Sequence, residues 1–209
     1  MKFKFYAMKL CGIIILVFLF QLFVRGFTEL FVLNRLAFIE VWRFVSSIFL
    51  HAGLGHLVYN LFALALFGSM LERLILGRRF LIAFFFSGIL ANLVSANFYS
   101  SSLGASGAIF GVIGSLIIVR PLLVVWAFGL PMPIFAAGIL WGAGDLIGAY
   151  GFLSGNPIDN TGNIAHLSGM FFGLLFGALF KGRKSQRKRK NRFRIKEGKM
   201  KKWEKAYLR

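Results

Sequence analysis

The chain alternates long apolar runs with short polar links, a pattern typical of a protein that crosses a membrane several times. After Lys9 the first run continues without a charge to Arg25. It lacks the short core and small-residue cleavage site of a signal peptide, so we interpret it as an uncleaved first span, a signal anchor. Five further stretches are each near the length that a helix needs to cross about 30 Å of hydrocarbon. They are about Leu54–Met70, Phe80–Phe98, Ala105–Val119, Pro133–Tyr150 and Ile164–Phe180.

Two links between these stretches are more apolar than free loops. Residues 121–133 are apolar but short and bracketed by prolines, so we expect an interfacial lead-in to the fifth span; an extra half-span over 122–130 is the alternative. The segment from Gly26 to about Gly53 is long and rich in Phe, Leu and Val. We expect it to lie partly in the outer membrane interface, with Trp42 and Arg43 at headgroup level.

The distribution of Lys and Arg indicates an even number of spans with both termini in the cytoplasm, because short cytoplasmic links collect positive charge. An odd number would place the basic C-terminal tail across the membrane from the N-terminal lysines. We therefore predict an all-α integral membrane protein of the cell membrane. A six-transmembrane-helix bundle with a long extracytoplasmic first loop covers residues 1–180, and a polybasic cytoplasmic tail covers residues 181–209. The cytoplasmic side then holds the tail and Lys2, Lys4, Lys9, Arg73, Arg78, Arg79 and Arg120.

Composition supports the membrane assignment. The 209 residues are 58% hydrophobic and 15% charged, with a mean hydropathy of +0.74, which excludes an ordinary soluble domain. Most of the formal net charge of +18 lies in the tail. Clustered Lys and Arg beside a span are attracted to anionic lipid headgroups, and nothing in the tail resembles a nucleic-acid recognition module. We expect lipid and not nucleic acid as its partner. The single Cys11 excludes a disulfide framework.

Polar side chains at membrane depth are costly and mark candidate functional sites. His56 and Asn60 are four residues apart, so they share one helix face near the outer end of the second span. Ser106 and His166 lie at the outer ends of the fourth and sixth predicted spans. The predicted topology therefore brings four polar side chains to a similar depth on the same side of the membrane.

Small residues indicate how Ser106 and His166 meet. Glycines follow each of them at about four-residue spacing, which lets membrane helices approach to backbone contact. We therefore predict that the fourth and sixth spans are neighbours and that Ser106 lies within hydrogen-bond distance of His166. A neutral histidine is the usual base for a serine nucleophile. The alternatives are a serine that serves packing, a structural His56–Asn60 pair and a structural His166. The glycines are Gly107, Gly111, Gly114, Gly169, Gly173 and Gly177.

Three motifs resemble the rhomboid family of intramembrane serine proteases. They are "GASGAIFG" around Ser106, "HAGLGHLVYN" with His56 and Asn60, and "AHLSGMFFGLLFG" with His166, and they occur in the family's order. The likeness covers about residues 40–180. It extends to a Trp-Arg pair before the first histidine and to a Glu-Arg pair after the second span, namely Trp42, Arg43, Glu72 and Arg73.

The resemblance implies a serine endopeptidase that cuts peptide bonds in or near transmembrane segments of membrane proteins. Ser106 would be the nucleophile and His166 the base, a dyad without a carboxylate. His56, Asn60 and the backbone N–H of Ser106 would stabilise the oxyanion, with Gly104 supporting them. The chemistry needs no metal and no cofactor. We expect His51 to hold the first loop by hydrogen bonds without touching substrate. Further structural residues near the site would be Gly107, Gly169, Trp42 and Arg43.

Weaker hypotheses concern the fifth span and the overall class. Asp145 is either a third catalytic member or a helix–helix hydrogen-bond partner, and we favour the second because the family lacks a third member. Trp141 is a hypothetical part of a lateral gate, since in rhomboids the fifth span packs against the second. Glu72 and Arg73 are expected to fix the cytoplasmic end of the second span. The alternative function is a catalytically inactive rhomboid-like factor that binds membrane proteins; a transporter is disfavoured because the spans carry few acids and no repeat.

Overall fold

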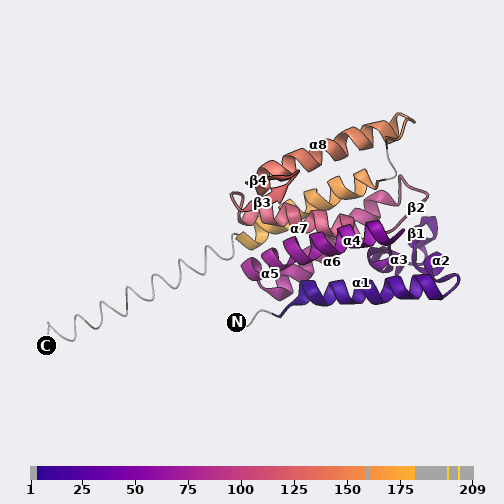
Figure 1. Ribbon diagram of the computed structural model, residues 1–209, viewed down its shortest axis with the longest axis horizontal. Coiled ribbons are helices and arrows are strands. Elements are labelled where there is room, and N and C mark those ends of the chain that lie inside the picture. The colour runs from indigo at the N-terminus through magenta and orange to yellow at the C-terminus, as the bar shows by residue number, and fades with distance from the viewer. Residues whose placement is uncertain (1–3, 159–160, 182–196, 198–201, 203–209) are drawn as a thin grey trace.

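The computed structural model describes residues 4–158, 161–181, 197 and 202, so most of the predicted basic tail lies outside the described residues. The fold is mainly helical, as predicted (Figure 1). One helical segment, Leu54–Ile75, consists of α4 (Leu54–Ala63), a π-helical turn (Leu64–Gly68) and α5 (Ser69–Ile75). The other long helices are α1 (Tyr6–Phe23), α6 (Gly77–Ser95), α7 (Ser106–Val119), α8 (Ile134–Leu153) and a C-terminal helix (Asn163–Lys181).

Five helical segments are long and apolar enough to cross a membrane, judged by length and composition. They correspond to the predicted first, second, third, fifth and sixth spans. The predicted fourth span corresponds to α7, which at 14 residues is shorter. Most of α7 is buried inside the protein, so its length need not match the thickness of the lipid around the bundle. The count of six crossings therefore stays a prediction.

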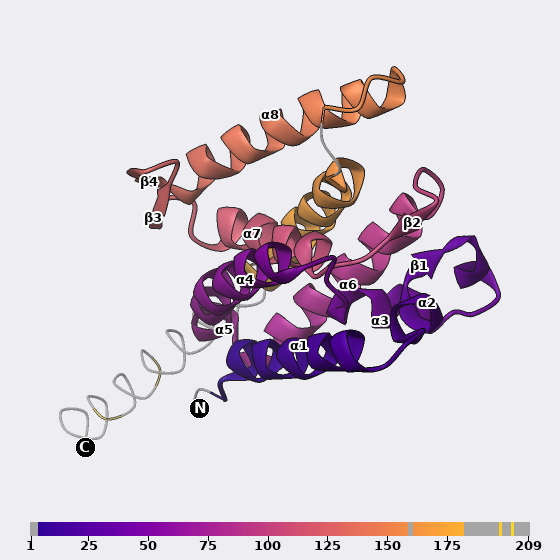
Figure 2. The ribbon, with the colours of Figure 1, turned by 45° about the vertical axis from the view of Figure 1, so that its right-hand side comes forward.

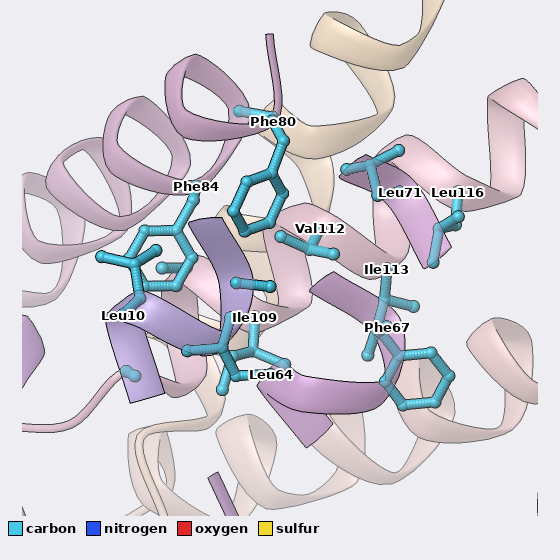
Figure 3. Packing of buried hydrophobic residues seen from close by; sticks show 14 of the residues in the cluster. Leu10, Leu64, Phe67, Leu71, Phe80, Phe84, Ile109, Val112, Ile113 and Leu116 are labelled. Carbon is cyan, nitrogen blue, oxygen red and sulfur yellow. The ribbon is translucent and has the colours of Figure 1, made fainter. Parts of the chain in front are cut away.

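Helix α7 lies at the centre of the bundle. It contacts α4, α5, α6 and α8, and Figure 2 shows it between the second helical segment and α8. The hydrophobic core forms around it (Figure 3) and includes Phe80 and Phe84 from α6 together with Val112 and Leu116 from α7. All four side chains are fully buried. The site residues at the start of α7 therefore rest on the most tightly enclosed helix.

The glycines of α7 and of the C-terminal helix make the predicted close contact. A Cβ atom on Gly169 would lie 2.9 Å from the carbonyl carbon of Gly107, and one on Gly173 would lie 2.6 Å from that of Gly111. Both distances are shorter than real Cβ contacts, so only glycine fits at these positions. The Ser115 hydroxyl donates to the Gly173 carbonyl at 2.9 Å across the same interface. The prediction that these two helices are neighbours is confirmed.

One end of the bundle gathers basic side chains from several helices. The buried Glu72 carboxylate at the end of α5 accepts the backbone N–H of Ala7, so the first turn of α1 lies there. The Arg79 guanidinium at the start of α6 lies 5.7 Å from the Phe180 ring centroid. Glu72 thus ties the second helical segment to α1, at the end where the positive-inside analysis places the cytoplasm. A pocket at this end is lined by Leu74, Ile75, Arg79, Val119, Arg120, Phe180 and Lys181.

The segment between α1 and α4 is folded, and Arg43 is bound inside it. Trp42 is 51% exposed, but Arg43 is buried: its Nη1 donates to the carbonyls of Glu29 and Val32 at 2.8 and 2.9 Å, and its Nε to Glu40. The guanidinium therefore binds loop carbonyls inside the protein. The position of Trp42 and Arg43 at headgroup level stays a prediction. The elements are α2 (Phe27–Phe31), a 3-10 turn (Arg35–Phe38), α3 (Arg43–Ser46), a second 3-10 turn (Ser47–Phe49), and β1 (Leu33–Asn34), which pairs antiparallel with β2 (Ser101–Ser102).

The link between α7 and α8 is a β-hairpin and not a half-span. Strands β3 (Val124–Ala127) and β4 (Leu130–Pro133) pair antiparallel around a two-residue turn at Phe128 and Gly129, both with positive φ. Alternate side chains of β3 face the core, because successive strand residues point to opposite faces. The alternative of an extra half-span is therefore wrong, while the interfacial position of this link stays a prediction. The all-α prediction needs this hairpin and the β1–β2 pair added.

Candidate active site

His166 is fixed by a ring that sequence reasoning missed. It lies in the first turn of the C-terminal helix, and its imidazole stacks on Phe110 of α7 with centroids 4.3 Å apart and planes 5° apart. Phe110 follows Ser106 by four residues, so both project from the same face of α7. This four-residue spacing is the feature of the sequence that could have drawn attention to Phe110. The stack brings His166 to the helix turn that Ser106 begins.

The Nδ1 edge of the His166 ring contacts the Asp145 carboxylate on α8. His166 Nδ1 lies 2.9 Å from Asp145 Oδ1, and both residues are more than nine-tenths buried. We expected Asp145 to be a helix–helix hydrogen-bond partner. It does bond across helices, but its partner is the candidate base, so the contact belongs to the site.

Ser106 is the first residue of α7 and is partly exposed. Within the described part of the chain, no hydrogen bond joins its hydroxyl to His166, so the predicted bond is not formed in this structure. Catalytic hydrogen bonds are often long before substrate binds. The first backbone N–H groups of a helix lack acceptors within it, which leaves the N–H of Ser106 available to an oxyanion.

Gly104, which stands two residues before Ser106 in the chain, lies against the His56 ring of α4. Gly104 has a φ of +125°, and a Cβ there would lie 2.7 Å from His56 Cε1, so glycine is required for both reasons. His56 Nδ1 accepts the backbone N–H of Ala52 at 3.4 Å. An accepting Nδ1 places the ring proton on Nε2, which is then a donor. Nε2 would lie 3.0 Å from that Cβ, so this edge faces the loop leading to Ser106.

Asn60 supports His56 from the next turn of α4. Its amide donates to the His56 carbonyl at 2.8 Å, and the residue is 3% exposed. Because an amide nitrogen carries two hydrogens, one remains for another acceptor. Asn60 and His56 therefore stand together as predicted from their four-residue spacing.

His51 is held in the loop before α4. The Gln21 side chain at the end of α1 accepts the His51 N–H at 2.9 Å and donates to the His51 carbonyl at 3.3 Å. The His51 ring is 5.0 Å from the His56 ring. Burial and the nearby His56 lower the pKa of His51 from 6.5 to about 4, so it is neutral at pH 7. The hydrogen bonds that hold the loop run mainly through the His51 backbone.

Trp141 lies one turn before Asp145 on α8. Its ring packs edge-on to Phe67 of the second helical segment at 5.8 Å and against Phe128 of the hairpin at 5.9 Å. The fifth predicted span therefore touches the second at this aromatic pair. Among the described residues, no three His, Cys, Asp or Glu side chains group as metal ligands would.

The chain is similar in sequence to known proteins. The model of the family described as the Rhomboid domain matches residues 39–183. This chain belongs to the rhomboid family. The matched region contains every candidate site residue and begins just before the Trp42–Arg43 pair. Family membership and the five apolar helical segments together indicate a multi-pass membrane protein.

Several curated rhomboid relatives are similar in sequence. The rhomboid protease GluP of Bacillus subtilis is 36% identical over 138 residues, covering 64% of this chain and 25% of that protein. The putative rhomboid protease YdcA of the same organism is 42% identical over 78 residues, or 36% of this chain and 39% of YdcA. The rhomboid protease GlpG of Haemophilus influenzae is 32% identical over 142 residues, 66% of this chain and 69% of GlpG. The chain thus spans a quarter of the length of GluP and about two fifths of YdcA.

Proposed function

We propose that this chain is an intramembrane serine endopeptidase that hydrolyses peptide bonds in or near transmembrane segments of membrane proteins. The observation that carries the proposal is the packing of the His166 ring on Phe110, one helix turn from Ser106. This contact holds a buried histidine beside the serine that begins the buried, central helix α7. The similarity to two proteins named rhomboid proteases supports the same reaction.

In the proposed reaction, His166 Nε2 takes the proton of the Ser106 hydroxyl as its oxygen attacks the substrate carbonyl. The resulting oxyanion collapses, the peptide C–N bond breaks, and His166 gives the proton to the leaving amine. Water then attacks the ester on Ser106, with His166 again acting as the base. As the second oxyanion collapses, the acyl C–O bond breaks and His166 returns the proton to the Ser106 oxygen, so the free enzyme is restored and both peptide fragments are released.

The oxyanion would be stabilised by donors from two directions. One is the N–H of Ser106 at the start of α7, and the other is the Nε2–H of His56, which the Ala52 contact leaves as a donor. Asn60 supplies a further amide hydrogen from α4. Removal of one such donor lowers kcat by about 10²- to 10³-fold in enzymes that use them. Because both Ser106 and His166 are present, the inactive alternative has no residue change to support it.

The same proposal covers topology and partners. Six crossings would place both termini in the cytoplasm and the site toward the outer side, where single-span substrates are cut. The basic end of the bundle, with Arg79, Arg120 and Lys181 around one pocket, suits a surface of anionic lipid headgroups. The Lys and Arg residues of the tail, residues 181–209, would bind the same kind of headgroup. No cofactor takes part in the proposed reaction.

The test uses purified protein in detergent, a fluorophosphonate probe and a fluorescent transmembrane substrate. Wild type should label covalently and cleave, and Ser106→Ala should do neither. His166→Ala should keep the fold but lose both signals, because an unassisted serine hydroxyl is a weak nucleophile. A folded wild-type protein that neither labels nor cleaves would contradict the proposal and favour a binding role.

A further inference from the structure

We propose that Asp145 is a positioning residue that orients His166 toward Ser106, so that a carboxylate completes what the family resemblance presents as a dyad. The inference rests on the proposed serine-protease function. Its starting point is the 2.9 Å contact between Asp145 Oδ1 and His166 Nδ1. The two side chains come from different helices, α8 and the C-terminal helix, and both are about nine-tenths buried.

An ionised Asp145 fixes which nitrogen of His166 carries the proton. The ionised carboxylate only accepts hydrogen bonds, so Nδ1 is the donor. In a neutral imidazole the Nε2 atom then has no hydrogen and can accept one. This is the form that a base for Ser106 requires. When His166 takes the serine proton, the adjacent carboxylate stabilises the positive imidazolium.

Two independent contacts leave the ring little freedom. Phe110 lies parallel to the ring and restricts its tilt, since the planes differ by 5°. Asp145 holds the Nδ1 edge and prevents the ring from rotating about its own axis. The remaining edge, with Nε2, is the one left for chemistry. Ser106 projects from the same face of α7 as Phe110, so a base that is held in this way stays beside the nucleophile.

The nature of the side chain argues against a purely structural contact. In sequence, Asp145 is the sole acid between Glu72 and Asp159, and a buried carboxylate is costly in a low-dielectric interior. Its second oxygen, Oδ2, has no hydrogen-bond partner among the described residues. The two helices already meet three residues further along, where a Cβ on Gly148 would lie 2.6 Å from Asn163 Cγ. Holding these helices together therefore does not require a carboxylate at position 145.

The principal test is Asp145→Asn, which keeps the shape but removes the charge. We expect kcat to fall by about 10²- to 10⁴-fold, as when a triad aspartate is made neutral, with KM changed less than about threefold. Asp145→Glu should recover part of kcat because it restores a carboxylate. Ser115→Ala is the matched control: it removes another buried interhelical hydrogen bond, that to Gly173, and should lower the unfolding temperature but not kcat.

A second measurement does not depend on turnover. The chain has three histidines, so nitrogen NMR of ¹⁵N-histidine-labelled protein, assigned by His51→Gln and His56→Gln, resolves the His166 signals. Wild type should show His166 protonated at Nδ1, and Asp145→Asn should show more of the Nε2-protonated form. Undiminished kcat in a folded Asp145→Asn variant, or a His166 spectrum that the variant leaves unchanged, would overturn the positioning role alone. A folded wild type without cleavage or labelling would instead overturn the proposed function, and this role with it.

Discussion

The close contact between α7 and the C-terminal helix gives a sharp prediction about Gly173. In Gly173→Ala the new Cβ would lie 2.6 Å from the carbonyl carbon and 2.7 Å from the Cα of Gly111, while ordinary contact begins at 3.4 Å. The neighbours are backbone atoms, so no side chain can move aside. The two helices must separate by about 1 Å, which also stretches the Ser115–Gly173 hydrogen bond.

Two consequences of that separation can be measured. Overpacking of this kind costs about 1–3 kcal/mol of stability. The separation also displaces His166 from Phe110 and Ser106, and a misplacement of about 1 Å in a catalytic group lowers the rate by about 10²-fold. We therefore expect both a lower unfolding temperature in detergent and at least a tenfold loss of cleavage of a transmembrane substrate.

The matched control is Gly12→Ala on α1, where an added Cβ meets nothing within 4 Å. It makes the same chemical change in a helix and should leave activity unchanged, with stability equal or slightly higher, because alanine favours helix over glycine. If Gly173→Ala matched Gly12→Ala in both stability and cleavage, the backbone contact between the two helices would be refuted.

Three further predictions use other parts of the structure. Glu72→Ala should lower stability by about 1–3 kcal/mol, because it leaves the N–H of Ala7 unpaired at the start of α1; chemical unfolding in detergent measures it. His51 binds a proton near pH 6.5 when unfolded and near 4 when folded, so stability rises with pH across this window. Between pH 7.5 and pH 5, the free energy of unfolding of wild type should fall by about 2 kcal/mol more than that of His51→Gln. An equal fall in both proteins would refute this. Trp141→Ala removes the contact with Phe67 and should change cleavage of a membrane-embedded substrate but not fluorophosphonate labelling, whereas unchanged cleavage would exclude a gate role.

Much of the fold followed from the sequence because hydropathy and glycine spacing have direct physical meaning. The apolar runs located the helices to within a few residues, apart from the second, which continues five residues beyond Met70. The glycines after Ser106 and His166 indicated which helices touch. Hydropathy could not identify the β3–β4 hairpin, because a short apolar run fits a strand as well as a helix. Nor could charge alone show that the loop carbonyls bind Arg43.

The sequence was enough to propose members of the candidate site but not to predict their contacts. The spacing of His56 and Asn60 and the topology of Ser106 and His166 brought the four polar residues together. The stacking of Phe110 on His166 is a tertiary contact: the four-residue spacing places Phe110 on the same helix face as Ser106, but it does not predict that His166 packs there. Asp145 was singled out as an intramembrane acid, but its partner depends on how α8 crosses the C-terminal helix, and sequence spacing does not determine that crossing.

The placement of Asp145 and Trp141 on α8 links the positioning role of Asp145 to the gate hypothesis for Trp141. They are four residues apart, so they share one face of the helix. Trp141 touches Phe67 of the second helical segment, and Asp145 touches His166. An outward movement of α8 that admits a transmembrane substrate would therefore withdraw the carboxylate from the base as it opens the aromatic pair. In that case His166 is fully oriented only when α8 returns, and cleavage requires that the helix close again around the bound segment. The same face of α8 would then control both entry to the site and its reactivity.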